Sequence, residues 1–130
     1  MHALTSVLFV HKLAHVLPPA YAVSCLKSHL GATLAFYIVC GRPALDIGAL
    51  LDYRGKKALD SSNPWLSVIK RAIDIDEVHV TKAVRSCALA DTLFGAEESY
   101  SQLLLNTAQM SLDLEGDWDF QGVGWPESWE

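Results

Sequence analysis

The sequence has no long block of one charge. Its ten lysines and arginines are scattered along 130 residues, and the formal net charge is −5. A nucleic-acid surface requires clustered cations, and clustered cations are also what an anionic membrane surface attracts. The composition therefore predicts no nucleic-acid partner and no membrane partner.

Cysteine is also scarce. The three cysteines (Cys25, Cys40 and Cys87) are odd in number, lie far apart and form no C-x-x-C pair, so a zinc knuckle is not indicated. Scattered cysteines among apolar neighbours usually behave as small buried hydrophobes in a reducing compartment. We therefore expect a cytoplasmic protein.

Several other signals are missing. The sequence has no P-loop, no G-x-G-x-x-G and no G-x-S-x-G motif. The apolar N-terminus is interrupted by His11 and Lys12 and has no basic segment before it, so we do not interpret it as a signal peptide. The most lipid-like run, residues 20–40, contains Lys27 and His29, which leave too short an apolar stretch to span a bilayer. A membrane-associated protein is therefore the weakest of the alternatives.

Hydrophobic residues, in contrast, are abundant. They make up 51% of the chain against 19% charged residues, so the chain can bury a core. Apolar side chains recur at helical spacing, and no stretch shows a convincing strand-like alternation. We predict an all-α fold of about six helices with an irregular tail that holds three of the four tryptophans and lies across the helices. The expected helices are Ala3–Leu17, Pro19–Cys40, Leu45–Tyr53, Trp65–Ile73, Asp74–Gly95 and Ser99–Leu112.

Local signals fix several helix ends. Pro19 suits the first turn of the second helix, and Gly41 suits the position just after its end. Asn63 is the expected N-cap of the fourth helix, with Pro64 at its first position. Gly95 is expected to end the fifth helix.

The second helix is apolar nearly all round, which is typical of a buried helix. A chain of 130 residues has little material with which to surround such a helix, and no cap precedes the first helix. We therefore expect residues 1–130 to form one helical segment of a larger helical domain, a fragment whose exposed apolar helices can self-associate.

The strongest candidate site lies on the fifth helix, where His79 and Lys82 are three residues apart and share one face. Ser86 continues this side, and Val80, Ala83, Val84, Cys87 and Ala88 form the adjoining apolar arc. Histidine supplies a nitrogen ligand suited to iron or zinc. A charged lysine cannot bind a cation, but a lysine carboxylated by CO2 is an anionic oxygen ligand, and carboxylation requires a desolvated, neutral amine. Taken alone, the pair is better explained as an ordinary surface pair with its polar ends in water.

A second histidine pair is weaker. His11 and His15 have the four-residue spacing of zinc-binding helices, but Lys12 stands where a metalloprotease has its glutamate. A half-exposed polar strip is the favoured explanation. His2 is a polar residue on a strongly apolar helix, and a frayed terminus explains it equally well.

Several short segments together resemble the questin oxidase-like family of fungal polyketide-pathway oxidoreductases. They occur in the family's order and cover nearly the whole chain. They are His2 with Thr5-Ser6 and Leu8-Phe9, Leu26 through Tyr37, Gly41-Arg42-Pro43 with Leu45, Asn63-Pro64-Trp65, Asp76 with His79-Val80, Lys82 and Arg85, and finally Trp118, Gly122, Gly124 and Glu127 to Trp129. The family's proteins are mainly helical and much longer, so the resemblance implies that this chain is a C-terminal portion.

The resemblance also implies an activity. The family's reactions are oxidative and belong to secondary metabolism, including Baeyer–Villiger-type oxygen insertion and ring cleavage on aromatic polyketides such as anthraquinones. Some members are NADPH-dependent, and some relatives hold a non-haem iron through several histidines and a carboxylated lysine. Carried over, this pattern places His2, His79 and Lys82 at the metal, with the remaining ligands outside this chain.

Two interpretations of function therefore stay open. In the first, the chain is part of an oxygenase that acts on an aromatic polyketide. In the second, it is a non-catalytic helical remnant or a binding module that keeps the fold without turnover.

Overall fold

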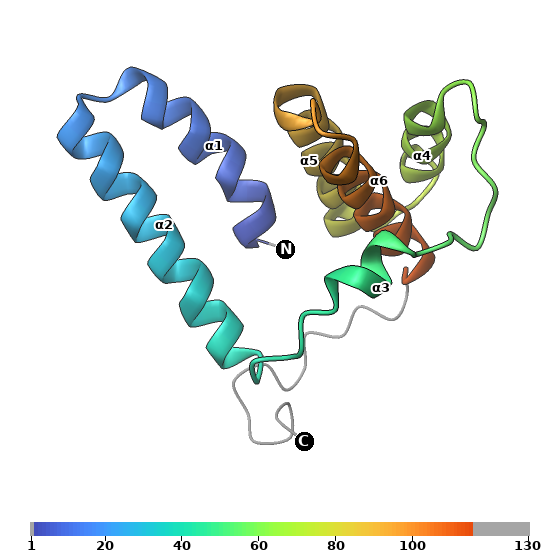
Figure 1. The fold of residues 1–130 in the computed structure, drawn as a ribbon, viewed down its shortest axis with the longest axis horizontal. Helices are drawn as coiled ribbons and strands as arrows, with labels where there is room; N and C mark the ends of the chain where they lie inside the picture. Colours follow the sequence, from blue (N-terminus) through green and yellow to red (C-terminus); the bar gives the residue numbers. More distant parts are fainter. Residues whose placement is uncertain (1, 116–130) are drawn as a thin grey trace. The chain divides into compact units, whose positions relative to one another are not determined.

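A computed structural model describes residues 2–115 of the chain. Across this range the chain is all-α, which confirms the predicted fold class (Figure 1). The predicted tryptophan-rich tail lies outside the described residues. The helices are α1 (His2–Val16), α2 (Pro19–Val39), α3 (Ile47–Leu51), α4 (Pro64–Ile73), α5 (Val78–Phe94) and α6 (Glu98–Asp113).

These helices divide into two compact units. The first contains α1 and α2, and the second contains α3 to α6. The prediction of one helical segment over residues 1–130 stays a prediction, because it includes the tail.

The first unit is a helical hairpin in which α1 packs against α2 (Figure 1). Leu17 and Pro18 separate the two helices, and Pro19 occupies the first turn of α2 as predicted. Its buried apolar residues are Leu8, Val10 and Ala22. Most of the apolar surface of α2 is exposed. Contrary to the expectation from Lys27 and His29, α2 is long and apolar enough to cross a membrane, the one such helix among the described residues. Core helices of soluble proteins share this length and composition.

The C-terminus of α2 is closed by a left-handed turn. Gly41 has φ 82° and Arg42 has φ 55°. The Arg42 N–H donates to the Tyr37 carbonyl at 3.0 Å, and the Gly41 N–H donates to the Ile38 carbonyl at 3.0 Å. This pair of bonds is the glycine-dependent cap of a helix end, and it confirms the predicted role of Gly41.

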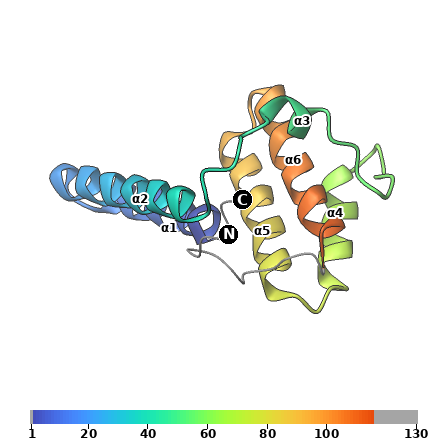
Figure 2. The same cartoon turned by 90° about the horizontal axis from the view of Figure 1, so that it is seen from below.

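The second unit is built around α5, which packs against both α4 and α6, while α3 packs on α6 (Figure 2). Many of the buried side chains in this unit are small. The buried residues of α5 are Val80, Ala83, Val84, Ser86, Cys87 and Ala90. Burial raises the pKa of the Cys87 thiol to about 11.

Side-chain caps explain where the helices of this unit begin. The Asn63 side chain accepts the Leu66 N–H at 3.0 Å, which confirms the predicted cap of α4. The start of α3 is Ile47 rather than Leu45, because the Asp46 carboxylate accepts the Ala49 N–H at 2.8 Å.

The start of α5 also differs from the expected Asp74. Asp74 closes the C-terminus of α4, and Glu77 is the N-cap that begins α5. The predicted helix over residues 74–95 was therefore too long by about one turn.

Candidate functional site

His79 lies in the first turn of α5 and is held by Glu77. The Glu77 carboxylate accepts the backbone N–H of His79 at 3.0 Å and lies 2.7 Å from its Nδ1. The backbone bond and then the side-chain bond from His79 lower the pKa of Glu77. The carboxylate therefore stays charged and orients the imidazole, an arrangement common among metal-binding histidines.

Lys82 lies one turn after His79 and is exposed, as is Arg85. The side chain of His79 itself is 33% exposed. Ser86, expected to continue this polar side, is buried among the apolar side chains of α5. The histidine therefore fits a metal ligand, whereas the exposed lysine has none of the burial that carboxylation requires.

The third predicted ligand, His2, opens α1 in the first unit, whereas His79 and Lys82 belong to the second. The backbone carbonyl of His2 accepts a hydrogen bond from the Ser6 hydroxyl at 2.6 Å. Within residues 2–115, no group of three or more His, Cys, Asp or Glu side chains is placed to hold a metal ion. The set of His2, His79 and Lys82 stays a prediction.

The second histidine pair is brought together by its helix. The rings of His11 and His15 lie 4.5 Å apart between centroids. The His15 Nδ1 donates to the His11 carbonyl at 2.8 Å. One ring nitrogen of this pair is thus used for bonding within the helix.

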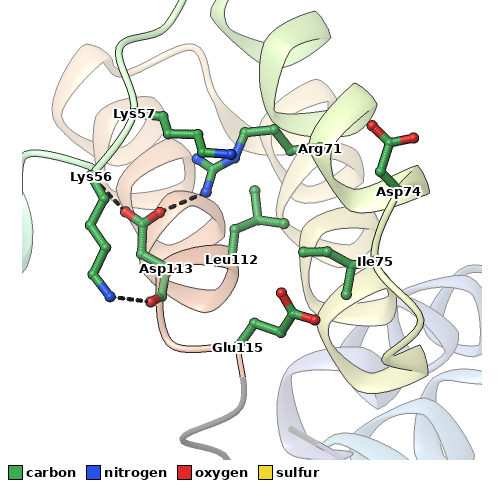
Figure 3. A pocket seen from close by; sticks show the side chains of 8 residues that line it. All are labelled: Lys56, Lys57, Arg71, Asp74, Ile75, Leu112, Asp113 and Glu115. Atoms are coloured by element: carbon green, nitrogen blue, oxygen red, sulfur yellow. Dashed lines mark hydrogen bonds and ion pairs between the residues drawn. The ribbon is translucent and has the colours of Figure 1, made fainter.

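A polar cluster that the sequence did not reveal surrounds Asp113, at the end of α6. The side chain of Asp113 is only 1% exposed. Its Oδ1 accepts from Arg71 Nη2 at 2.7 Å, and its Oδ2 accepts from the Lys56 backbone N–H at 2.7 Å (Figure 3). Its Oδ2 also accepts from the Tyr53 hydroxyl at 2.9 Å. The Lys56 ammonium donates to the Asp113 carbonyl at 2.7 Å. This carboxylate connects α4, the 53–56 loop and α6.

The charge of Asp113 is set by two opposing effects. Burial raises its pKa, but the hydrogen bonds from Arg71, Lys56 and Tyr53 outweigh burial and lower it. Burial and the bond to Asp113 raise the pKa of Tyr53. Asp113 is therefore an anion and Tyr53 a neutral donor at neutral pH.

A hollow of about 410 Å³ opens beside this cluster (Figure 3). Its lining combines cations, acids and two apolar side chains. The lining residues are Lys56, Lys57, Arg71, Asp74, Ile75, Leu112, Asp113 and Glu115. The basic turn at residues 54–57 was the one signal in the sequence for this hollow. Asp113 gave no signal, because it lies one residue past the expected end of the last helix.

The geometry thus defines an all-helical protein with a carboxylate-oriented histidine on α5. Comparison with known families identifies the family of this chain. A family model described as Questin oxidase-like matches residues 1–87, more than half of the chain. The chain therefore belongs to the questin oxidase-like family, as its short motifs predicted, and this is an oxidoreductase-type family. No curated protein and no solved structure matched the chain.

The matched span has a direct bearing on the candidate sites. It includes His2, His79 and Lys82, and it stops before Asp113. Of the Asp113 cluster, the matched span contains Tyr53, Lys56 and Arg71 but not Asp113 itself.

Proposed function

We propose that this chain takes part in an oxygenase reaction of the questin oxidase-like type on an aromatic polyketide such as an anthraquinone, in secondary metabolism. The observation that carries the proposal is the family match over residues 1–87. It supports an oxidoreductase, and it contains all three predicted metal ligands. The substrate class rests on the family resemblance.

The role of His79 in this proposal follows from its bond to Glu77. In the neutral tautomer that donates from Nδ1 to the carboxylate, the lone pair is on Nε2. That nitrogen can accept a proton from a phenol or bind a cation. Glu77 is the positioning residue, because its carboxylate fixes which nitrogen takes this role.

Non-haem iron is the metal that fits this proposal, with His2, His79 and a carboxylated Lys82 as its ligands from this chain. When bound, the iron would supply the oxidative chemistry, and NADPH is the reductant that the family resemblance implies. The exposure of Lys82 in the described structure means that its carboxylation would need cover from a further segment or a bound substrate.

Metal analysis of the purified chain tests the site without relying on activity. We expect iron or zinc in the wild-type protein, a loss in His79→Ala, and about tenfold weaker binding in Glu77→Gln. His29→Ala is the matched control, since His29 also lies on a helix but outside both candidate histidine sets. Equal and low metal content in wild type and His79→Ala would contradict the proposed ligand set.

A binding module without turnover is the second candidate. The exposed apolar surface of α2 favours it, because such a surface tends to associate with another one. Sedimentation of the purified chain, together with the metal analysis, distinguishes the two candidates. A self-associated chain without metal supports the binding module, and a metal-containing chain supports the oxygenase. Cytoplasmic localisation is part of both proposals, and retention in a carbonate-washed membrane fraction would contradict it.

A further inference from the structure

The hollow beside Asp113 is lined by side chains of both charges. Lys56, Lys57 and Arg71 form a cationic wall around Asp113, and Asp74 and Glu115 add two further acids to the lining (Figure 3). Ile75 and Leu112 contribute apolar surface to the same hollow (Figure 3). The hollow is therefore suited to a ligand with a charged end and an apolar body.

The cationic wall is only partly neutralised by the protein. Asp113 pairs with Nη2 of Arg71, whereas Nη1 of Arg71 is buried and has no hydrogen-bond partner among residues 2–115. The Lys56 ammonium bonds a neutral carbonyl, so its charge remains. A buried donor without an acceptor is costly, and an anion in the hollow would remove this cost.

A further cation of this hollow is Lys57. Its side chain is exposed and lines the hollow together with Arg71. Exposed side chains change rotamer within nanoseconds, so Lys57 can turn toward an entering anion. Charge-assisted bonds from a guanidinium and an ammonium suit a carboxylate in particular.

We propose that this hollow is a binding site for a small aromatic carboxylate, whose oxygens accept from Arg71 Nη1 and Lys57 Nζ while its ring lies on Ile75 and Leu112. The site is separate from the predicted metal ligands. It requires neither metal nor turnover, so it can hold or fail independently of the proposed function.

Titration with benzoate, followed by amide NMR of the full chain, tests the proposal. Because the shifts are read residue by residue, binding at this hollow is separated from contact with the apolar surface of α2. We expect saturable shifts at Lys57, Ile75 and Leu112 that weaken with added salt. Benzamide is the neutral control ligand and should bind clearly more weakly.

The variant Lys57→Gln should bind benzoate roughly fivefold more weakly, the effect of one exposed charged contact. Lys70→Gln is its matched control, because Lys70 is an exposed lysine on α4 that does not line the hollow. Both substitutions lie on the surface and leave the Asp113 cluster intact. The proposal is overturned by unsaturable shifts, by equal binding of benzamide and benzoate, or by equal binding to the two variants. Inorganic phosphate binding as tightly as benzoate would overturn the role given to Ile75 and Leu112.

Discussion

Helices α2 and α5 show how differently two apolar segments can be buried. α2 has 21 residues and buries only Ala22, whereas α5 has 17 residues and buries six. α2 is the more hydrophobic of the two in composition, but within its own unit it packs against α1 alone. α5 lies in contact with both α4 and α6. Burial therefore follows from the neighbours that a helix has and not from its hydrophobicity.

Because of this difference, we expect the stability of the two units to respond differently to substitutions. The second unit encloses its own core and its own polar cluster, so its stability should respond to single substitutions. The hairpin leaves most of its apolar side chains in water, so substitutions there should matter little until another surface covers them. The following predictions test this contrast.

Removing the carboxylate of Asp113 should have the largest effect. The variant Asp113→Ala leaves the Arg71 guanidinium, the Tyr53 hydroxyl and the Lys56 N–H without their acceptor, which should destabilise the second unit by about 3 kcal/mol. Hydrogen exchange of α5 and α6 measures the change locally. Asp76→Asn, an exposed carboxylate in the same unit, is the control and should change little. Equal protection in both variants would show that the cluster does not hold the unit together.

Truncation of matched valines gives the next effect and compares the two helices directly. Val80 is fully buried on α5, whereas Val23 is 48% exposed on α2. We expect Val80→Ala to cost about 2 kcal/mol, from lost transfer energy and a residual cavity. Val23→Ala should cost less than about 0.5 kcal/mol. Similar costs in denaturant unfolding would mean that α2 is covered in solution.

The contact between α4 and α5 should contribute less. Trp65 donates its indole N–H to Asp91 Oδ2 at 2.7 Å. Trp65→Phe keeps the aromatic ring and removes the donor, which should cost about 1.5 kcal/mol because the acceptor is charged. Asp91→Asn is the companion variant, since an amide oxygen can still accept and should retain part of the bond. A Trp65→Phe protein as stable as wild type in denaturant unfolding would show that this hydrogen bond is not needed.

The smallest expected effect is a loss of folding stability at low pH. Hydrogen bonds lower the pKa of Asp113 in the folded chain, so the unfolded chain binds a proton more readily. The stabilisation is present above the ordinary aspartate pKa of about 4 and is lost as the pH falls through the lower folded value. Unfolding measured between about pH 5 and pH 2 should therefore show declining stability, and Asp113→Asn should flatten that slope. An unchanged slope in Asp113→Asn would assign the acid sensitivity to other carboxylates.

The features that could be predicted from sequence are those fixed by neighbouring residues. The Asn63 cap and the Gly41 turn depend only on residues close together in the chain, and both occur where predicted. The apolar arc of α5 also follows from helical periodicity. Exact helix starts are harder, because Asp74 and Asp76 are as suitable a cap as Glu77, the residue that begins α5.

The polar cluster could not be predicted, because its members are distant in the chain. Tyr53 and Asp113 are 60 residues apart, and Arg71 and Asp113 are 42 apart. Nothing in the local pattern indicates that these side chains meet. The burial of Ser86 could not be predicted either. Helical periodicity places Ser86 on the same side of the helix as His79 and Lys82, but α5 buries it.

Because Cys87 is buried, its reactivity toward thiol reagents reports when α5 separates from the helices packed against it. Its thiol is fully buried and has a pKa near 11, so at neutral pH it is almost entirely protonated and screened from reagents. Cys40 is exposed and Cys25 is partly exposed. A thiol-specific label should therefore modify two sites quickly, and the slow arrival of the third label would time the separation of α5 from its neighbours.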